Sequence, residues 1–161
     1  MRRKYNYLNN SQFLLDFFKQ PISEHFVKIT VLNAKEKPLK EVQGIITGGN
    51  VSISGQSSVR RTANISAFIE DNVASYMEIG GLFSLNKKIN IEIGITNTTD
   101  QYSEYPVLWF PLGVYVIINL NSSHGTNGTS ISLQLKDKMC LLNGDCGGKL
   151  AASTQFDEYE T

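Results

Sequence analysis

The chain lacks an excess of charge of either sign. Its 161 residues hold 15 basic and 15 acidic side chains, so the formal net charge is +0 at pH 7. This balance removes the usual electrostatic signature of a protein that binds nucleic acid or an anionic membrane, and leaves a local patch as the only route to such binding. We therefore expect no sequence-specific binding of nucleic acid.

Long hydrophobic runs are also missing. The longest one, residues 105–120 (YPVLWFPLGVYVIINL), is interrupted by two prolines and a glycine and falls short of the roughly 20 residues that a spanning helix needs. The basic N-terminus leads only into FLLDFF at residues 13–18, which Asp16 interrupts, and no small-residue cleavage site follows. The sequence therefore predicts no membrane segment and no signal peptide.

Cysteine and histidine are scarce, with two of each. Cys140 and Cys146 are at most half of a zinc site, because His25 and His124 lie far away in sequence. A nucleophilic arrangement of Cys140, His124 and Asp137 can be written down, but nothing in the sequence groups these residues. A local disulfide is disfavoured without a sign of secretion. We expect reduced structural cysteines, no metal, no cofactor and no enzymatic activity.

The sequence is rich in alternation of period two. The clearest stretch is residues 88–96, where isoleucines at positions 89, 91, 93 and 95 alternate with Asn, Glu, Gly and Thr. We expect these four isoleucines to be buried on one face of a strand. The other predicted strands cover residues 25–33, 40–47, 50–54, 61–70, 107–110, 113–120 and 129–135.

Turn signals rich in Gly and Asn separate these runs, such as TGGN at residues 47–50 and NSSHGTNGT at residues 121–129. Many short strands with such turns predict a mostly β protein, an antiparallel barrel or sandwich. The glycine pairs lack the spacing of a phosphate-binding loop, so they are interpreted as turns.

Three short helices are expected. The first covers residues 10–19, with Asn10 or Ser11 as its N-cap and Pro21 ending it, and its apolar residues occupy more than one stripe. Such a helix should be buried on two sides or docked onto something else. Two further helical pieces are predicted at residues 71–79 and 137–144.

Aromatic residues gather around Pro106 and Pro111, which suggests a second function class. On a sheet, such a set can bind carbohydrate or peptide, although it more often forms core and rim contacts. This alternative is a non-enzymatic β-sandwich binding module. The residues of the set are Tyr102, Tyr105, Trp109, Phe110 and Tyr115.

Two adjacent arginines stand where the strand of residues 61–70 begins. Arg61 falls on the same face as the apolar Ala63 and Ile65, where an unpaired charge is disfavoured by several kcal/mol. We expect it to pair with the Asp137 carboxylate or, alternatively, with the backbone carbonyls of residues 141–144. Arg60 falls on the opposite face, where it is expected to contact a neighbouring chain.

Two segments carry a family resemblance. Residues 44–68 place a strand, glycines, a second strand and Ser-x-x-Arg-Arg-Thr before a third strand. Residues 110–144 carry x-x-G-x-Y-x-I, a turn rich in Gly and Ser, and a strand that ends in x-D-K-x-x-x-L-x-G. These patterns resemble the N-terminal domain of the tail hub, or baseplate hub, proteins of long-tailed bacteriophages, which join the tail tube to the baseplate. The Cys140 and Cys146 pair departs from the family pattern.

The resemblance implies a barrel of the tail-tube type with a flanking helix, assembled into a homo-oligomeric ring. It implies a structural virion protein, assembled in the host cytoplasm, with tail tube, distal tail, tape measure and baseplate proteins as partners. The corresponding domains are a helical arm at residues 1–24, the barrel at 25–148 and an extended exit at 149–161 that leads toward a further domain.

The resemblance also implies roles for individual residues. It places Arg60, Arg61 and Thr62 at the strand entry, Gly113 and Tyr115 in the penultimate strand, and Asp137, Lys138, Leu142 and Gly144 in the closing turn. We expect structural or interface roles for Arg60, Arg61, Thr62, Trp109, Tyr115, Asp137 and Lys138.

Overall fold

The computed structural model describes residues 5–20, 24–41, 45–69, 83–84, 87–126 and 128–146. Most of these residues belong to strands, which confirms the predicted mostly β class. The strands are β1 (His25–Leu32), β2 (Pro38–Glu41), β3 (Ile45–Ile53), β4 (Arg61–Ile69), β5 (Lys88–Thr96), β6 (Val107–Gly125) and β7 (Gly128–Asp137). The short helices are η1 (Asn6–Asn9), α1 (Ser11–Phe17) and η2 (Lys138–Leu141).

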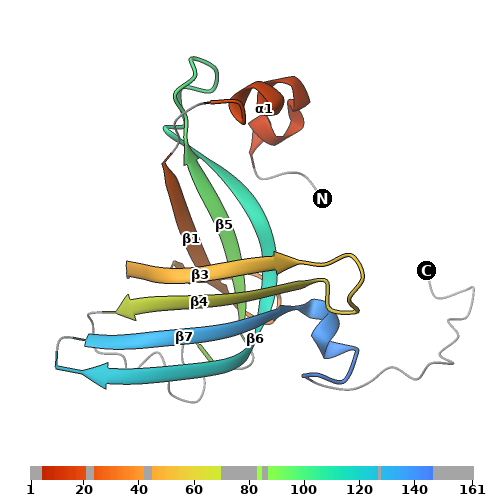
Figure 1. Ribbon diagram of the computed structural model, residues 1–161, viewed down its shortest axis with the longest axis vertical. Helices are drawn as coiled ribbons and strands as arrows, with labels where there is room; N and C mark the ends of the chain where they lie inside the picture. The colour runs from red at the N-terminus through yellow and green to blue at the C-terminus, as the bar shows by residue number, and fades with distance from the viewer. Residues whose placement is uncertain are drawn as a thin grey trace, which may run out of the picture.

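The strands form one antiparallel sheet of seven strands in the order β2-β1-β5-β6-β7-β4-β3. Figure 1 shows that β1 and β5 run steeply across the view while β3, β4 and β7 run nearly at right angles to them. The long strand β6 belongs to both groups, because it pairs with β5 along its first half and with β7 along its second. The sheet is therefore folded across β6.

The bend in β6 coincides with irregular pairing. Gly113 pairs with Ile91 and Pro111 pairs with Glu92, so Leu112 is an extra residue in β6, and a second irregularity follows between Ile117 and Asn119. An extra residue bends a strand and lets it pass from one packed layer to the next. The prediction of separate strands at residues 107–110 and 113–120 is therefore wrong, because β6 includes both segments and continues through the bulge between them. The predicted turn at residues 121–129 is mostly strand as well, because β6 continues to Gly125.

The predicted TGGN turn lies inside β3, so the prediction of two strands at residues 40–47 and 50–54 is also wrong. A register irregularity occurs between Ile46 and Gly48, and a Cβ on Gly49 would lie 2.6 Å from the Asn64 carbonyl oxygen of β4. Gly48 thus lies at a bulge, and Gly49 lies where the backbones of β3 and β4 approach closely. The predicted helical piece at residues 71–79 lies outside the described residues.

The main core lies between the two arms of the folded sheet and is mostly aliphatic. Ile89 and Ile91 are fully buried in it, as predicted, but Ile93 and Ile95 are only half-buried, and Ile95 packs instead against residues of the N-terminal segment. Its buried residues are Ile29, Val31, Ala63, Ile65, Phe83, Ile89, Ile91, Tyr115, Ile117, Ile131, Leu133 and Leu135.

A second cluster joins the N-terminal segment (residues 5–20) to the start of β6, and we call it the aromatic cluster. Its buried members are Tyr7, Leu8, Phe13, Phe17 and Leu108. The Asn10 side chain, one of the two predicted N-caps, caps α1 by accepting a hydrogen bond from the Phe13 amide at 3.1 Å. The helix is buried on one side only, because Leu15 is 60% exposed, as is the C-cap residue Phe18.

Tyr7 covers an open edge of the sheet. Between Val107 and Pro111, β6 pairs with β5 alone, since its pairing with β7 begins at Tyr115. The Tyr7 hydroxyl accepts a hydrogen bond from the Trp109 amide at 2.6 Å and donates one to the Trp109 carbonyl at 2.9 Å. The N-terminal segment thereby satisfies backbone groups that an edge strand would otherwise expose.

None of the described helices is long and apolar enough to cross a membrane.

Candidate functional site

The backbone carbonyl of Leu112 organises the bend of β6. It accepts hydrogen bonds from the Tyr115 hydroxyl at 3.2 Å and from the Arg61 guanidinium at 3.3 Å. Gly113, whose φ of +134° disfavours other residues, leaves room for the guanidinium, because a Cβ there would lie 2.6 Å from Arg61 Nη1. The start of β4 is thus held against the bend of β6, although the two elements are not neighbours in the sheet.

The structure brings Arg61 and Asp137 together, but through different atoms from those expected. Asp137 Oδ2 accepts a hydrogen bond from the Arg61 backbone amide at 2.9 Å, and its Oδ1 accepts one from the Met139 amide at 2.9 Å, which caps η2. The guanidinium binds the Leu112 carbonyl rather than the Asp137 carboxylate or the carbonyls of residues 141–144. Arg61 is exposed, so its guanidinium stays hydrated and loses little solvation free energy on folding. A carboxylate partner is therefore not needed to offset burial of the charge.

The other predicted site residues lie in varied surroundings. Thr62 is half-buried in β4, opposite Ser52 and Lys136. Lys138 is exposed and donates to Glu36 at 2.9 Å. Arg60 is exposed, and its side chain forms no hydrogen bond or ion pair with the described residues.

The two predicted aromatic site residues pack against the protein itself. Tyr115 is fully buried in the main core, and burial raises the pKa of its phenol. Trp109 is half-buried, with the Lys28 ammonium 5.3 Å from its ring centroid. Tyr102 and Tyr105 are partly buried against the aromatic cluster, where they contact the Tyr7 ring at 6.0 and 5.5 Å between centroids.

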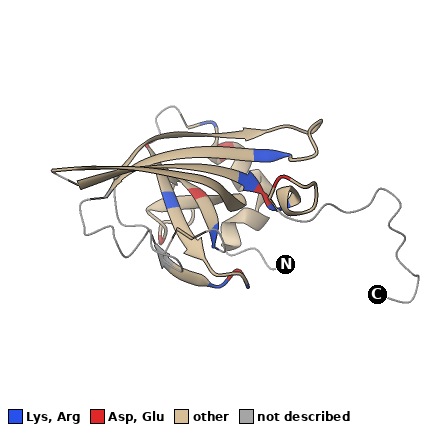
Figure 2. Cartoon of the chain, turned by 90° about the horizontal axis from the view of Figure 1, so that it is seen from below, with Lys and Arg blue, Asp and Glu red and all other residues tan. Residues whose placement is uncertain are grey.

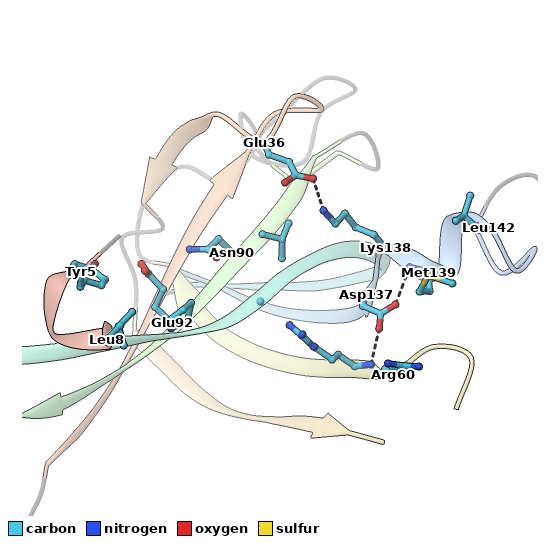
Figure 3. A pocket seen from close by; sticks show the side chains of 14 residues that line it. Tyr5, Leu8, Glu36, Arg60, Asn90, Glu92, Asp137, Lys138, Met139 and Leu142 are labelled. Atoms are coloured by element: carbon cyan, nitrogen blue, oxygen red, sulfur yellow. Dashed lines mark hydrogen bonds and ion pairs between the residues drawn. The ribbon is translucent and has the colours of Figure 1, made fainter. Parts of the chain in front are cut away.

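A groove of about 970 Å³ opens at the bend of the sheet. Figure 3 shows Tyr5, Leu8 and Glu92 toward one end of it and Arg60, Met139 and Leu142 toward the other, with Glu36 above. Residues from the N-terminal segment, the β1–β2 turn, the start of β4 and the closing segment (residues 137–142) therefore meet in one place. The apolar lining residues are Tyr5, Leu8, Pro111, Val114, Met139 and Leu142.

The carboxylates of the groove are already engaged. Glu36 accepts from Lys88 and Lys138, each at 2.9 Å, and these two hydrogen bonds hold the pKa of its carboxyl below the ordinary value. Its backbone is held at a φ of +60°, which is uncommon for a residue with a side chain. Glu92 is only 2% exposed and takes part in an interaction of its own. Because Asp137 already binds two amides, the groove offers guanidinium donors more readily than carboxylate acceptors.

The two cysteines lie close together and are free thiols in the structure, and the Cys146 amide donates to the Cys140 carbonyl at 3.0 Å. Burial, followed by the neighbouring Cys146, raises the pKa of the Cys140 thiol to about 12, so it is a poor nucleophile at neutral pH. The candidate partner His124 contacts Thr129 at 2.7 Å near the tip of the β6–β7 hairpin. Since Thr129 and Asp137 are separated by most of β7, roughly 26 Å of strand, the structure does not assemble Cys140, His124 and Asp137.

No three His, Cys, Asp or Glu residues in the described part of the chain are placed to share a metal ion. Figure 2 shows basic and acidic residues interspersed over the described chain rather than gathered by sign. No local pattern in the sequence marks Glu36, Leu112 or the N-terminal residues of the groove, so none of them was predicted as a site residue.

No protein-family model and no curated protein matches this chain. Among solved structures, the chain is similar to part of the Francisella PdpA-VgrG complex in its half-lidded form, with 14% sequence identity and a TM-score of 0.45. The match covers 84% of this chain and 21% of that chain, so this chain spans about a fifth of its structural relative. A similarity at this level does not establish a shared function.

Proposed function

We propose that this chain is a structural protein of a bacteriophage tail, with no catalytic activity, that assembles with further copies of itself into a hub ring. The ring would join the tail tube to the distal tail or the baseplate. It would assemble in the host cytoplasm and become part of the virion. The sequence patterns of residues 44–68 and 110–144 motivate the proposal.

The observation that carries it is the open edge of β3. At the other edge of the sheet, β2 has only four residues and includes Pro38 and two charged residues, features that discourage pairing with another chain. β3 has nine residues and no charged residue, and no described strand pairs with its outer side. Such an edge favours addition of a strand from a neighbouring subunit.

The hydrogen bonds of the hairpin show which backbone groups face outward. The Ser54 amide donates to the Arg60 carbonyl at 2.8 Å, so Ser52 and Asn50, two and four residues back, also direct their amides toward β4. The amides of Ile53, Val51 and Gly49 then point away from the sheet. Ile53 also presents an apolar side chain that is 68% exposed. An outward donor and an exposed apolar side chain thus occur at the same residue.

A proline substitution tests the edge directly. Ile53→Pro removes an outward amide but no hydrogen bond to β4, whereas Ile53→Thr changes the side chain and retains the amide. The parent and both variants are compared by sedimentation velocity and by negative-stain electron microscopy. We expect rings of the parent and of Ile53→Thr, and a loss of rings for Ile53→Pro with the fold retained by circular dichroism.

Two results would overturn the proposal. One is a parent chain that sediments as a monomer up to its solubility limit and gives no rings in micrographs. The other is a set of rings that Ile53→Pro leaves unchanged, because the open edge would then have no part in the assembly.

A further inference from the structure

The groove at the bend of β6 combines two features that a ligand would have to match. One is the presence of two arginines, Arg60 and Arg61, among the residues that line it. The other is an apolar surface beside them, in which Met139 is 46% and Leu142 is 44% exposed. Figure 3 places Arg60, Met139 and Leu142 toward the same end of the groove.

The guanidinium groups have unused donors. A guanidinium carries five N–H donors, yet the Arg61 side chain makes one hydrogen bond to a described residue, at 3.3 Å to a carbonyl, and the Arg60 side chain makes none. Asp137, the carboxylate of the closing segment, already accepts hydrogen bonds from the amides of Arg61 and Met139. No described carboxylate binds either guanidinium, so a carboxylate of a ligand would complement these two groups.

The size and lining of the groove narrow the ligand class. A volume of about 970 Å³ stands at the upper end of small-molecule sites and suits a short stretch of polypeptide. A free inorganic anion would use the arginines but would leave the apolar wall exposed. A peptide with an acidic residue next to large apolar side chains matches both features, because a carboxylate accepts two parallel hydrogen bonds from arginine while its neighbours cover Met139 and Leu142.

We propose that this groove is a docking site for a peptide segment of another protein that carries an aspartate or glutamate flanked by large apolar residues. Ring formation through β3 does not require the groove, so this inference goes beyond the proposed function. Arg60 and Arg61 bind the carboxylate, and Met139 and Leu142 receive the apolar side chains. The Leu112 carbonyl keeps the Arg61 guanidinium oriented toward the groove.

The test begins with selection of a random twelve-residue peptide library on the immobilised full chain. The enriched peptides are synthesised and their affinities are measured by fluorescence anisotropy. We expect enriched sequences in which an acidic residue has Leu, Phe, Met or Trp within a few positions. Replacing the acidic residue by its amide should weaken binding about tenfold or more, the effect of losing a charged hydrogen bond.

Variants of the protein locate the binding site. Arg60→Ala retains the backbone carbonyl that binds Ser54, and it should weaken binding about tenfold. Leu142→Ser should weaken it by a similar factor, and Arg60→Glu should abolish the preference for acidic peptides. The matched controls are Lys37→Ala and Ile53→Ser, an exposed cation and an exposed apolar residue outside the groove, which should leave affinity unchanged.

Three outcomes would overturn the inference. They are the absence of any enriched peptide, enrichment of peptides without acidic residues, and affinities that Arg60→Ala and Leu142→Ser leave unchanged. Acetate or phosphate that competes fully at the same residues, with no gain from apolar neighbours, would show an anion site and no peptide site. Because none of the groove variants alters an outward amide of β3, ring assembly and peptide binding can fail separately.

Discussion

The aromatic cluster and the closing segment both join parts of the chain that are distant in sequence, and they do so by different chemistry. In the aromatic cluster the Tyr7 ring contacts those of Tyr5, Tyr105 and Phe110 at centroid distances of 5.3 to 6.1 Å, and much of the contact is apolar area. In the closing segment one carboxylate, that of Asp137, bridges two backbone amides.

This difference determines which substitutions each region tolerates. Burial of apolar area and ring packing depend on the volume and shape of side chains, so truncation of a buried ring should be costly. A contact made by backbone amides depends on their acceptor and is indifferent to the side chains that carry the amides. We therefore expect the Arg61 side chain to contribute less to stability than the Asp137 carboxylate.

Phe17→Ala should have the largest effect. Phe17 is 1% exposed, and loss of a buried phenyl ring lowers the free energy of unfolding by about 3 to 5 kcal/mol through transfer and cavity effects. Leu15, which is 60% exposed on the same helix, supplies the control: Leu15→Ala should cost less than about 1 kcal/mol. Urea denaturation measures both, and equal losses would mean that α1 does not contribute through its buried side.

Tyr7→Phe should have the next largest effect, because it keeps the ring and removes only the hydroxyl. The amide and carbonyl of Trp109 then lose their partner at the edge of β6, at a cost of about 1 to 3 kcal/mol. Hydrogen exchange of the Trp109 amide should accelerate at the same time. Unchanged exchange would show that the hydroxyl does not protect this edge.

Asp137→Ala should cost about 1 to 2 kcal/mol, because it removes the acceptor of the Arg61 amide and the cap of η2. Arg61→Ala keeps its amide and should cost less than about 1 kcal/mol, since the side chain gives up one long hydrogen bond. Thermal unfolding of both variants tests this order. A larger loss of stability for Arg61→Ala than for Asp137→Ala would show that the guanidinium makes the main structural contact, as expected from the sequence.

Alkaline pH should produce the smallest effect under ordinary conditions. Burial raises the pKa of Tyr7 to about 12 from an ordinary value of 10, so above pH 10 the unfolded chain releases a proton that the folded chain retains. The stabilisation is complete below pH 10 and is lost as the pH rises toward 12. The unfolding midpoint in urea should fall across this window, and less so in Tyr7→Phe, which retains the buried Tyr115.

Local patterns predicted the elements whose causes are local. Alternation of period two located β1, β4 and β5 to within a residue or so of their ends, and the Asn10 cap located the start of α1. A helical piece was also predicted at residues 137–144, where the structure has η2 at Lys138–Leu141. These features depend on neighbours in the sequence, so the sequence by itself determines them.

Tertiary structure decided the rest, because the determining contacts join residues that are far apart in sequence. The carbonyl of Asn64 explains why Gly49 lies within β3, and the guanidinium of Arg61 occupies the space that Gly113 leaves in β6. The Tyr7 hydroxyl meets the Trp109 backbone across 102 positions, and Asp137 meets the Arg61 amide across 76. A period-two pattern reports which side chains alternate, but it contains no information on which backbone groups remain unpaired until the sheet has folded across β6.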